Sequence, residues 1–281
     1  MQIAISGAGG FVGRRLVEAL ETGKHSVTRL GRDAAKDLPP HTHLDAVVHL
    51  AGEPVSQRWT VAAKQRIRDS RVIGTRNLVR GMAELKTPPR VLVCASATGF
   101  YGDRGEQMLD ESAGAGDGFL SDVCRGWEEE ADKATAFGVR VVKIRFGLVL
   151  GRDGGALGKM LLPFRLGLGA RLGDGSQWMS WIHLDDLTAM IQFAVEQDAA
   201  RGAWNGVAPN PVTNVEFTRQ LAAAVHRPAW FVAPQFLMKL GAGEMAQMLF
   251  DSQRCVPAAP LAAGFAFRYP ELGAALRAVV S

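Results

Sequence analysis

The chain has 281 residues, of which 47% are hydrophobic and 21% charged, so it has an ordinary globular composition and enough length for one large core or a main domain with a smaller appendage. The formal net charge is +4 and the Lys and Arg residues are scattered, which argues against a nucleic-acid partner. No apolar run approaches the ~20 residues needed to cross a bilayer, and no basic leader precedes the first strand pattern, so we expect a cytoplasmic protein without a membrane partner.

The amino-terminal segment carries the strongest signal in the sequence. Residues 2–6 have the pattern of a short buried strand, and Gly7, Gly10 and Gly13 follow at intervals of three. Gly7 allows a sharp turn, Gly10 allows backbone to approach a pyrophosphate, and Gly13 allows the next helix to lie close to the sheet. The start of that helix offers unpaired N–H groups to an anion. The segment therefore predicts a dinucleotide site.

Strand and helix patterns then alternate through the first half of the chain. This alternation is typical of an α/β fold, a doubly wound parallel sheet that binds its ligand at the carboxyl ends of the strands. The helices are predicted near residues 11–22, 60–84 and 118–136. The predicted strands are Gln2–Ser6, Ser26–Leu30, Ala46–Leu50, Arg90–Ser96 and Arg140–Phe146.

The composition of the sequence changes after Gly151, where a glycine-rich stretch runs to Gly175. We expect a dinucleotide-binding domain over residues 1–150 and a smaller region over 151–281 that covers the cofactor cleft. A segment near 185–205 is expected to pack back on the first domain.

The residues after the second predicted strand indicate which dinucleotide is bound. An NAD site normally has an acidic residue there, whereas this chain has Gly31 and Arg32. A guanidinium pairs with a 2′-phosphate and Gly31 leaves room for it, so we predict NADP(H). Asp33 follows directly and is the one residue that opposes this interpretation, if its carboxylate turns inward.

Neither the cysteines nor the histidines predict a metal site. Cys94, Cys124 and Cys255 are isolated and lack the spacing of a zinc cluster or a disulfide framework. We expect Cys94 and Cys124 to be buried, inert thiols. His41 and His43 form an HxH pair without nearby acidic or thiolate partners, which favours a solvated loop.

Several segments together resemble the extended short-chain dehydrogenase/reductases: Ser6–Gly13 (SGAGGFVG), Ala46–Gly52 (AVVHLAG), Ser70–Leu78 (SRVIGTRNL), Ala95–Gly102 (ASATGFYG) and Trp181–Asp186 (WIHLDD). The likeness is closer to the atypical, epimerase-like branch of NADP(H)-binding proteins. It rests on Leu50–Glu53 (LAGE), Trp127–Glu128, Leu148–Gly151 (LVLG), Met160–Gly167 (MLLPFRLG) and Asn205–Pro209 (NGVAP).

The resemblance implies a Tyr-x-x-x-Lys pair, which this chain lacks. In the family the lysine lowers the pKa of the tyrosine, which exchanges a proton at the substrate oxygen. With Glu128 placed on the acidic residue that usually follows the motif, Leu120 stands at the tyrosine position and Cys124 at the lysine position. Ala97 takes the usual serine or threonine position, beside Ser96.

The remaining candidates for a catalytic group are Tyr101, Glu53 and Ser96. Tyr101 follows the strand near residues 90–96 and is either a proton donor at the cleft or a structural hydroxyl at a turn. Glu53 follows the Ala51-Gly52 turn and is either a cleft acid or a carboxylate near a helix start. The cofactor contacts implied by the resemblance are Gly7, Gly10, Phe11, Val12, Gly13, Gly31, Arg32, Leu50, Ala51, Arg71, Arg145 and Val149.

Two functions stay open at this stage. The first is an NADP(H)-dependent oxidoreductase or epimerase-like enzyme that acts on an unidentified small polar substrate, as a monomer or a homo-oligomer. The second is a noncatalytic NADPH-binding sensor or protein-interaction module, which the loss of both Tyr and Lys favours.

Overall fold

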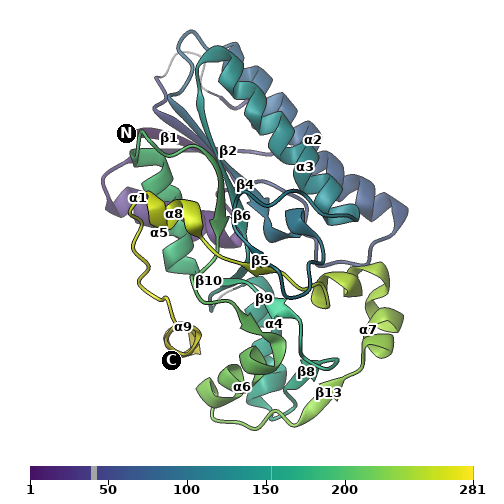
Figure 1. Ribbon diagram of the computed structural model, residues 1–281. Helices are drawn as coiled ribbons and strands as arrows, with labels where there is room; N and C mark the ends of the chain where they lie inside the picture. Colours follow the sequence, from purple (N-terminus) through teal and green to yellow (C-terminus); the bar gives the residue numbers. More distant parts are fainter. Residues whose placement is uncertain (39–42, 153, 281) are drawn as a thin grey trace.

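The centre of the molecule is a parallel sheet of six strands (Figure 1). The computed structural model describes residues 1–38, 43–152 and 154–280. The strands lie in the order β11-β6-β4-β3-β1-β2, and every neighbouring pair is parallel. Their bounds are β1 (Gln2–Ser6), β2 (Ser26–Leu30), β3 (Ala46–His49), β4 (Val91–Ala97), β6 (Arg140–Phe146) and β11 (Gly202–Gly206).

Helices cover both faces of this sheet, which confirms the predicted α/β doubly wound class. The helices α1 (Phe11–Thr22) and α5 (Leu184–Glu196) pack against each other on one face. The other face carries α2 (Val61–Ala83) and α3 (Phe119–Asp132), which run side by side in Figure 1. Alternate strand residues enter the two cores: Ile3 and Ile5 lie in the first, and Ala4 between them lies in the second.

Two predicted strands and one predicted helix have slightly different bounds in the structure. The strand expected to end at Leu50 ends at His49, where β1 turns away at Gly7, although the Leu50 N–H still donates to the Ser6 carbonyl oxygen at 3.0 Å. The strand expected at 90–96 covers Val91–Ala97 instead. The helix expected over 118–136 is α helical only to Asp132 and continues as a 3-10 turn, η2 (Lys133–Phe137), because Gly138 in the left-handed region (φ 83°) ends it.

The rest of the chain forms a smaller layer below the carboxyl ends of the sheet (Figure 1). It has its own apolar core, which includes Leu157, Phe164, Trp181, Phe217 and Leu276. From the carboxyl end of β4 onward its elements are η1 (Thr98–Tyr101), β5 (Met108–Leu109), β7 (Leu148–Leu150), α4 (Gly155–Arg165), β8 (Ala170–Leu172), β9 (Trp178–Met179), β10 (Trp181–His183), β12 (Val212–Thr213), α6 (Asn214–Ala224), β13 (Phe231–Ala233), α7 (Gln235–Ala242), η3 (Gly243–Leu249), β14 (Arg254–Cys255) and α9 (Leu272–Val280). The helix α8 (Ala258–Ala262) lies instead beside α1 and α5 and packs against β11 of the large sheet (Figure 1).

Chain segments cross between these two parts. After β10 the chain returns to the sheet as α5 and β11, and β11 pairs with β6 over Gly202–Gly206. Buried Asp186 fastens the later chain to α5, because its two carboxylate oxygens accept hydrogen bonds from the backbone N–H groups of Arg268 and Tyr269, each at 2.9 Å. None of the helices in the described ranges is both long and apolar enough to cross a membrane.

Candidate functional site

The glycine turn between β1 and α1 has no room for a side chain at Gly7 or Gly13. Gly7 has φ +76°, and a Cβ atom placed on it would lie 2.8 Å from backbone atoms of Leu50 and Ala51. A Cβ on Gly13 would lie 2.2 Å from the Gly7 carbonyl oxygen. The helix α1 begins after Gly10 without a side-chain cap, so its first N–H groups are available to a ligand.

Phe11 joins this turn to the glycine-rich segment that follows β7. Cβ atoms on Gly151, Gly154 and Gly155 would lie 2.6, 2.7 and 2.9 Å from its ring atoms. These glycines therefore make room for the Phe11 ring, which explains part of the high glycine content after residue 150. Val12 and Val149 also pack here, against the core between the sheet and α1 and α5.

The residues after β2 form the predicted adenosine end of the site. The Gly31 N–H donates a hydrogen bond to Asp37 Oδ2 at 2.7 Å, so a carboxylate oxygen occupies the acceptor position on this amide. Arg32 is exposed, and in the described residues no hydrogen bond or ion pair holds its guanidinium. The Asp33 carboxylate is 2.8 Å from Lys36 Nζ, in an exposed ion pair.

A buried histidine lies beneath the turn. The side chain of His49 is 2% exposed, with Nδ1 2.5 Å from Ser6 Oγ and Nε2 3.0 Å from Thr75 Oγ1. Burial, assisted by the charge of Arg71, lowers the His49 pKa to about 4, so the imidazole is neutral near pH 7. His49 therefore connects β1, β3 and α2 directly before Leu50 and Ala51, which form part of the predicted cofactor wall.

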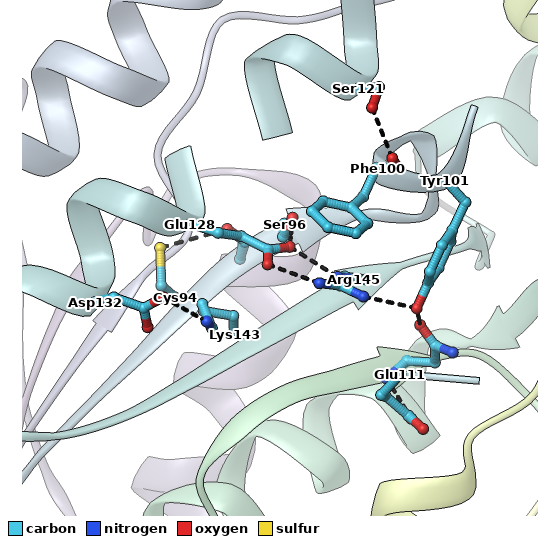
Figure 2. Close-up of polar contacts among 12 residues, drawn as sticks. Cys94, Ser96, Phe100, Tyr101, Glu111, Ser121, Glu128, Asp132, Lys143 and Arg145 are labelled. Atoms are coloured by element: carbon cyan, nitrogen blue, oxygen red, sulfur yellow. Dashed lines mark hydrogen bonds and ion pairs between the residues drawn. The ribbon is translucent and has the colours of Figure 1, made fainter. Parts of the chain in front are cut away.

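A buried ion pair lies at the carboxyl ends of β4 and β6 (Figure 2). Arg145 donates from Nε and Nη2 to the two Glu128 carboxylate oxygens at 2.8 and 2.9 Å, and the two side chains are 5% and 7% exposed. Ser96 Oγ donates to the same carboxylate at 2.7 Å. The Arg145 guanidinium also lies 3.5 Å from the centroid of the Phe100 ring.

Tyr101 is part of this network and has no exposed surface. Its phenol donates to Asn205 Oδ1 at 2.7 Å and accepts from Arg145 Nη1 at 2.8 Å. Burial raises the pKa of Tyr101 despite the neighbouring Arg145 charge. The phenol proton is thus engaged inside the protein.

The family's two catalytic positions are filled by packing side chains. Leu120 is half-buried and contacts the turn after β4, where a Cβ on Gly99 would be 3.2 Å from Leu120 Cβ. Cys124 is 3% exposed. Burial, together with the nearby Glu128 charge, raises the Cys124 pKa to about 11, so the thiol is protonated near pH 7.

Glu53 differs from Ser96 and Tyr101 because its carboxylate reaches solvent. The side chain is 34% exposed. Its Oε1 accepts a hydrogen bond from Gln57 Nε2 at 3.0 Å and lies 3.6 Å from Arg66 Nε. Its backbone N–H donates to Ser70 Oγ at 2.9 Å, which fixes the turn against α2.

Arg71 lies beneath that same turn. Its Nη1 donates to the backbone oxygens of Glu53 at 2.9 Å and Ile67 at 3.2 Å, and the guanidinium carbon is 5.1 Å from the centroid of the Trp127 ring. A Cβ on Gly52 would be 3.0 Å from that carbon. Burial lowers the Arg71 pKa.

The described residues contain no group of three or more His, Cys, Asp or Glu side chains placed to hold a metal ion. The HxH pair lies partly outside the described ranges, which omit His41; His43 Nε2 is 3.4 Å from Asp45 Oδ1. A hollow of about 230 Å³ lies at the amino-terminal edge of the sheet, away from the strand ends that carry the site, and includes Met1, Arg90 and Arg140.

Sequence reasoning missed the pairing of Glu128 with Arg145 and the roles of Asn205 and Asp37. The signal for the pair was available: Glu128 lies in the apolar stripe of a helix and Arg145 lies in an apolar strand. Two opposite charges at buried positions require each other. Asn205 gave no comparable signal, because it meets Tyr101 only in the folded chain. The contact of Asp37 with Gly31 is local, but no sequence pattern marks it.

Comparison with known proteins identifies the family. The model of the NAD dependent epimerase/dehydratase family matches residues 3–205. This chain belongs to that family. The predicted resemblance to an epimerase-like short-chain dehydrogenase/reductase is therefore confirmed. Residues 233–279 match a further domain model described as a domain of unknown function, DUF1731.

Full-length relatives place the chain among the epimerase family proteins. It is 40% identical to one from Mycobacterium bovis, with 98% of this chain and 96% of that protein covered. It is 38% identical to the chloroplastic SDR39U1 homolog of Arabidopsis thaliana, with 100% and 87% covered. The crystal structure of human epimerase family protein SDR39U1 with NADPH is 34% identical, covers 99% of each chain and has a TM-score of 0.93.

Proposed function

We propose that this chain binds NADP(H), with the pyrophosphate on the turn over Gly7–Gly13 and the 2′-phosphate at Gly31 and Arg32. One observation carries the proposal: the Gly31 amide already holds a carboxylate oxygen of Asp37, and the exposed Arg32 beside it has no counter-ion among the described residues. The 2′-phosphate would take the place of the Asp37 carboxylate on this amide and pair with the Arg32 guanidinium. The human relative solved with NADPH supports the same cofactor.

The other predicted contacts fit a dinucleotide that extends from this end across the strand termini. Leu50 and Ala51 would border the adenosine ribose, and Val149 would border the nicotinamide. Arg145 was predicted at the same end, but its donors are engaged by Glu128 and Tyr101. We therefore assign Arg145 to holding the wall of the site rather than to contacting the cofactor. Bound NADP(H) would supply or accept a hydride.

We further propose an oxidoreductase or epimerase-like activity on a small polar substrate, with Glu53 as the proton-transferring group. Of the three predicted candidates, Glu53 alone has a partly exposed side chain, whereas Ser96 donates to Glu128 and Tyr101 to Asn205 inside the protein. A general acid or base must reach the substrate directly or through one water. Ser96 and Tyr101 are accordingly positioning residues in this proposal.

The test uses NADPH-loaded protein mixed with panels of carbonyl compounds and sugar nucleotides. Nicotinamide absorbance follows net oxidation, and chromatography of the sugar nucleotides detects epimerisation without net oxidation. We expect Glu53→Gln to abolish turnover while NADPH affinity stays within about threefold. Glu106→Gln, at an exposed position, is the matched control for loss of one carboxylate. Turnover in Glu53→Gln equal to that of the wild type would refute the assignment.

The noncatalytic alternative is favoured by one specific observation: Leu120 and the protonated Cys124 occupy the family's Tyr and Lys positions. In that case the protein senses NADPH or engages a protein partner. No turnover of any carbonyl compound or sugar nucleotide, with NADPH affinity intact, would favour this alternative over the enzyme.

Three further expectations belong to the proposal. A cytoplasmic location is testable by cell fractionation, and a homo-oligomer by light scattering during gel filtration. The boundary near residue 150 is testable by limited proteolysis of the NADPH-loaded protein, which should cut first in the glycine-rich segment between residues 151 and 175.

A further inference from the structure

Arg71 is a partly buried cation whose guanidinium has no carboxylate partner among the described residues. Its hydrogen-bond acceptors are two backbone carbonyls, and Glu53, the acid whose backbone it contacts, turns its side chain toward Gln57 and Arg66. No Asp or Glu oxygen of the described residues forms an ion pair with it. A guanidinium removed from water is costly unless an anion or polarised oxygen compensates it. The two backbone oxygens accept hydrogen bonds from the Arg71 guanidinium but do not neutralise its charge, so that charge remains available to an anionic ligand.

Arg71 lies on α2 but is close to two residues of α3, Cys124 and Trp127. The Arg71 charge lowers the pKa of the Cys124 thiol, against the stronger effect of burial, which places the guanidinium near Cys124 on α3. The guanidinium also stacks near Trp127, one turn of helix beyond Cys124. Cys124 occupies the position at which the family carries its lysine. A positive charge is therefore present beside that position, although it comes from a different helix.

The other nearby guanidinium does not fill this role. Arg145 donates from Nε and Nη2 to Glu128 and from Nη1 to Tyr101, and the buried Glu128 carboxylate neutralises its charge. Arg71 reaches the strand ends because Gly52 has no side chain to obstruct it. Any larger residue at position 52 would displace the guanidinium, which ties the Ala51-Gly52 turn to this cation.

We propose that Arg71, from α2, supplies the positive charge that the family's lysine supplies from α3, and that it contacts the ribose–nicotinamide half of the bound dinucleotide. This inference rests on the proposed NADP(H) site. It adds a second cation to the site: Arg32 would contact the adenosine half of the cofactor, and Arg71 would contact the ribose–nicotinamide half.

The experiment is a double-mutant cycle with Arg71→Met and Cys124→Lys, read out with two ligands. NADPH contains both halves of the cofactor, and adenosine 2′,5′-bisphosphate contains only the adenosine half. Arg71→Met should weaken NADPH binding on the order of ten- to a hundredfold, the range for one charged hydrogen bond, and leave the bisphosphate affinity within about twofold. Arg71→Lys should retain most of the NADPH affinity.

The rescue arm distinguishes a cofactor cation from a structural one. Cys124→Lys alone should bind NADPH more weakly than the wild type, because two cations then lie side by side. In the Arg71→Met background the same substitution should restore most of the lost affinity, since the lysine returns the charge from the family's own position. A packing role for Arg71 predicts no such rescue.

Equal loss for both ligands in Arg71→Met, unchanged NADPH affinity, or a double variant that melts like the wild type and binds no better than Arg71→Met would each overturn the inference. Failure of the wild type to bind either ligand would instead refute the proposed function.

Discussion

Replacing His49 tests whether the support beneath the glycine turn has the electrostatics described. The imidazole is 2% exposed, and its pKa falls from an ordinary 6.5 to about 4, first through burial and then through the Arg71 charge. A histidine with a depressed folded-state pKa contributes stability that is present above pH 6.5 and is lost as the pH falls toward 4, because the unfolded chain takes up the proton first. One pKa unit corresponds to about 1.4 kcal/mol, so the loss reaches roughly 3 kcal/mol.

The assay is urea unfolding of the wild type and His49→Gln at intervals from pH 4.5 to 8. Gln can still bond Thr75 but does not titrate, and subtraction cancels the protonation of the carboxylates common to both proteins. The wild type should lose about 1.4 kcal/mol per pH unit relative to His49→Gln between pH 6 and pH 4.5. His43→Gln, at an exposed position, controls for the loss of one histidine. Parallel stability curves for the wild type and His49→Gln would refute the buried neutral imidazole.

Three further predictions concern the site's framework. Gly13→Ala should lower the melting temperature by at least several degrees, because its Cβ would lie 2.2 Å from the Gly7 oxygen, whereas Gly9→Ala, with nothing within 4 Å, should melt like the wild type; equal melting would contradict the close approach. Glu128→Gln should cost about 3–5 kcal/mol in urea unfolding because it leaves Arg145 buried and unpaired, and a loss below about 1 kcal/mol would contradict a compensated pair. The three buried cysteines should resist a thiol reagent near neutral pH in the native state and react after unfolding, so rapid native labelling would contradict their burial.

The parts of the fold that short segments determine could be predicted from the sequence. The strands Gln2–Ser6, Ser26–Leu30 and Arg140–Phe146 have the expected bounds because apolar periodicity and flanking glycines are local signals. The family resemblance was predictable for the same reason, since the motifs are continuous. The boundary errors are of one residue at β3 and β4, where the neighbouring strand decides which residues stay in the ladder.

Contacts between distant segments were beyond sequence reasoning. Tyr101 and Asn205 are 104 residues apart, and nothing near either indicates that the phenol donates to that amide. The Glu128–Arg145 pair depends on how α3 lies over β6, which periodicity does not fix. Phe11 shows the same limit: the glycines after residue 150 were noticed, but their role in accommodating its ring required the folded chain.

The most direct test of the account is calorimetric titration of the wild-type protein with NADPH and with NADH. A 2′-phosphate held by the Arg32 guanidinium is worth roughly 1.5–3 kcal/mol, so NADPH should bind about ten- to a hundredfold more tightly, and Arg32→Ala should remove the difference. Equal affinities in the wild type, or no heat with either cofactor, would contradict the proposed site.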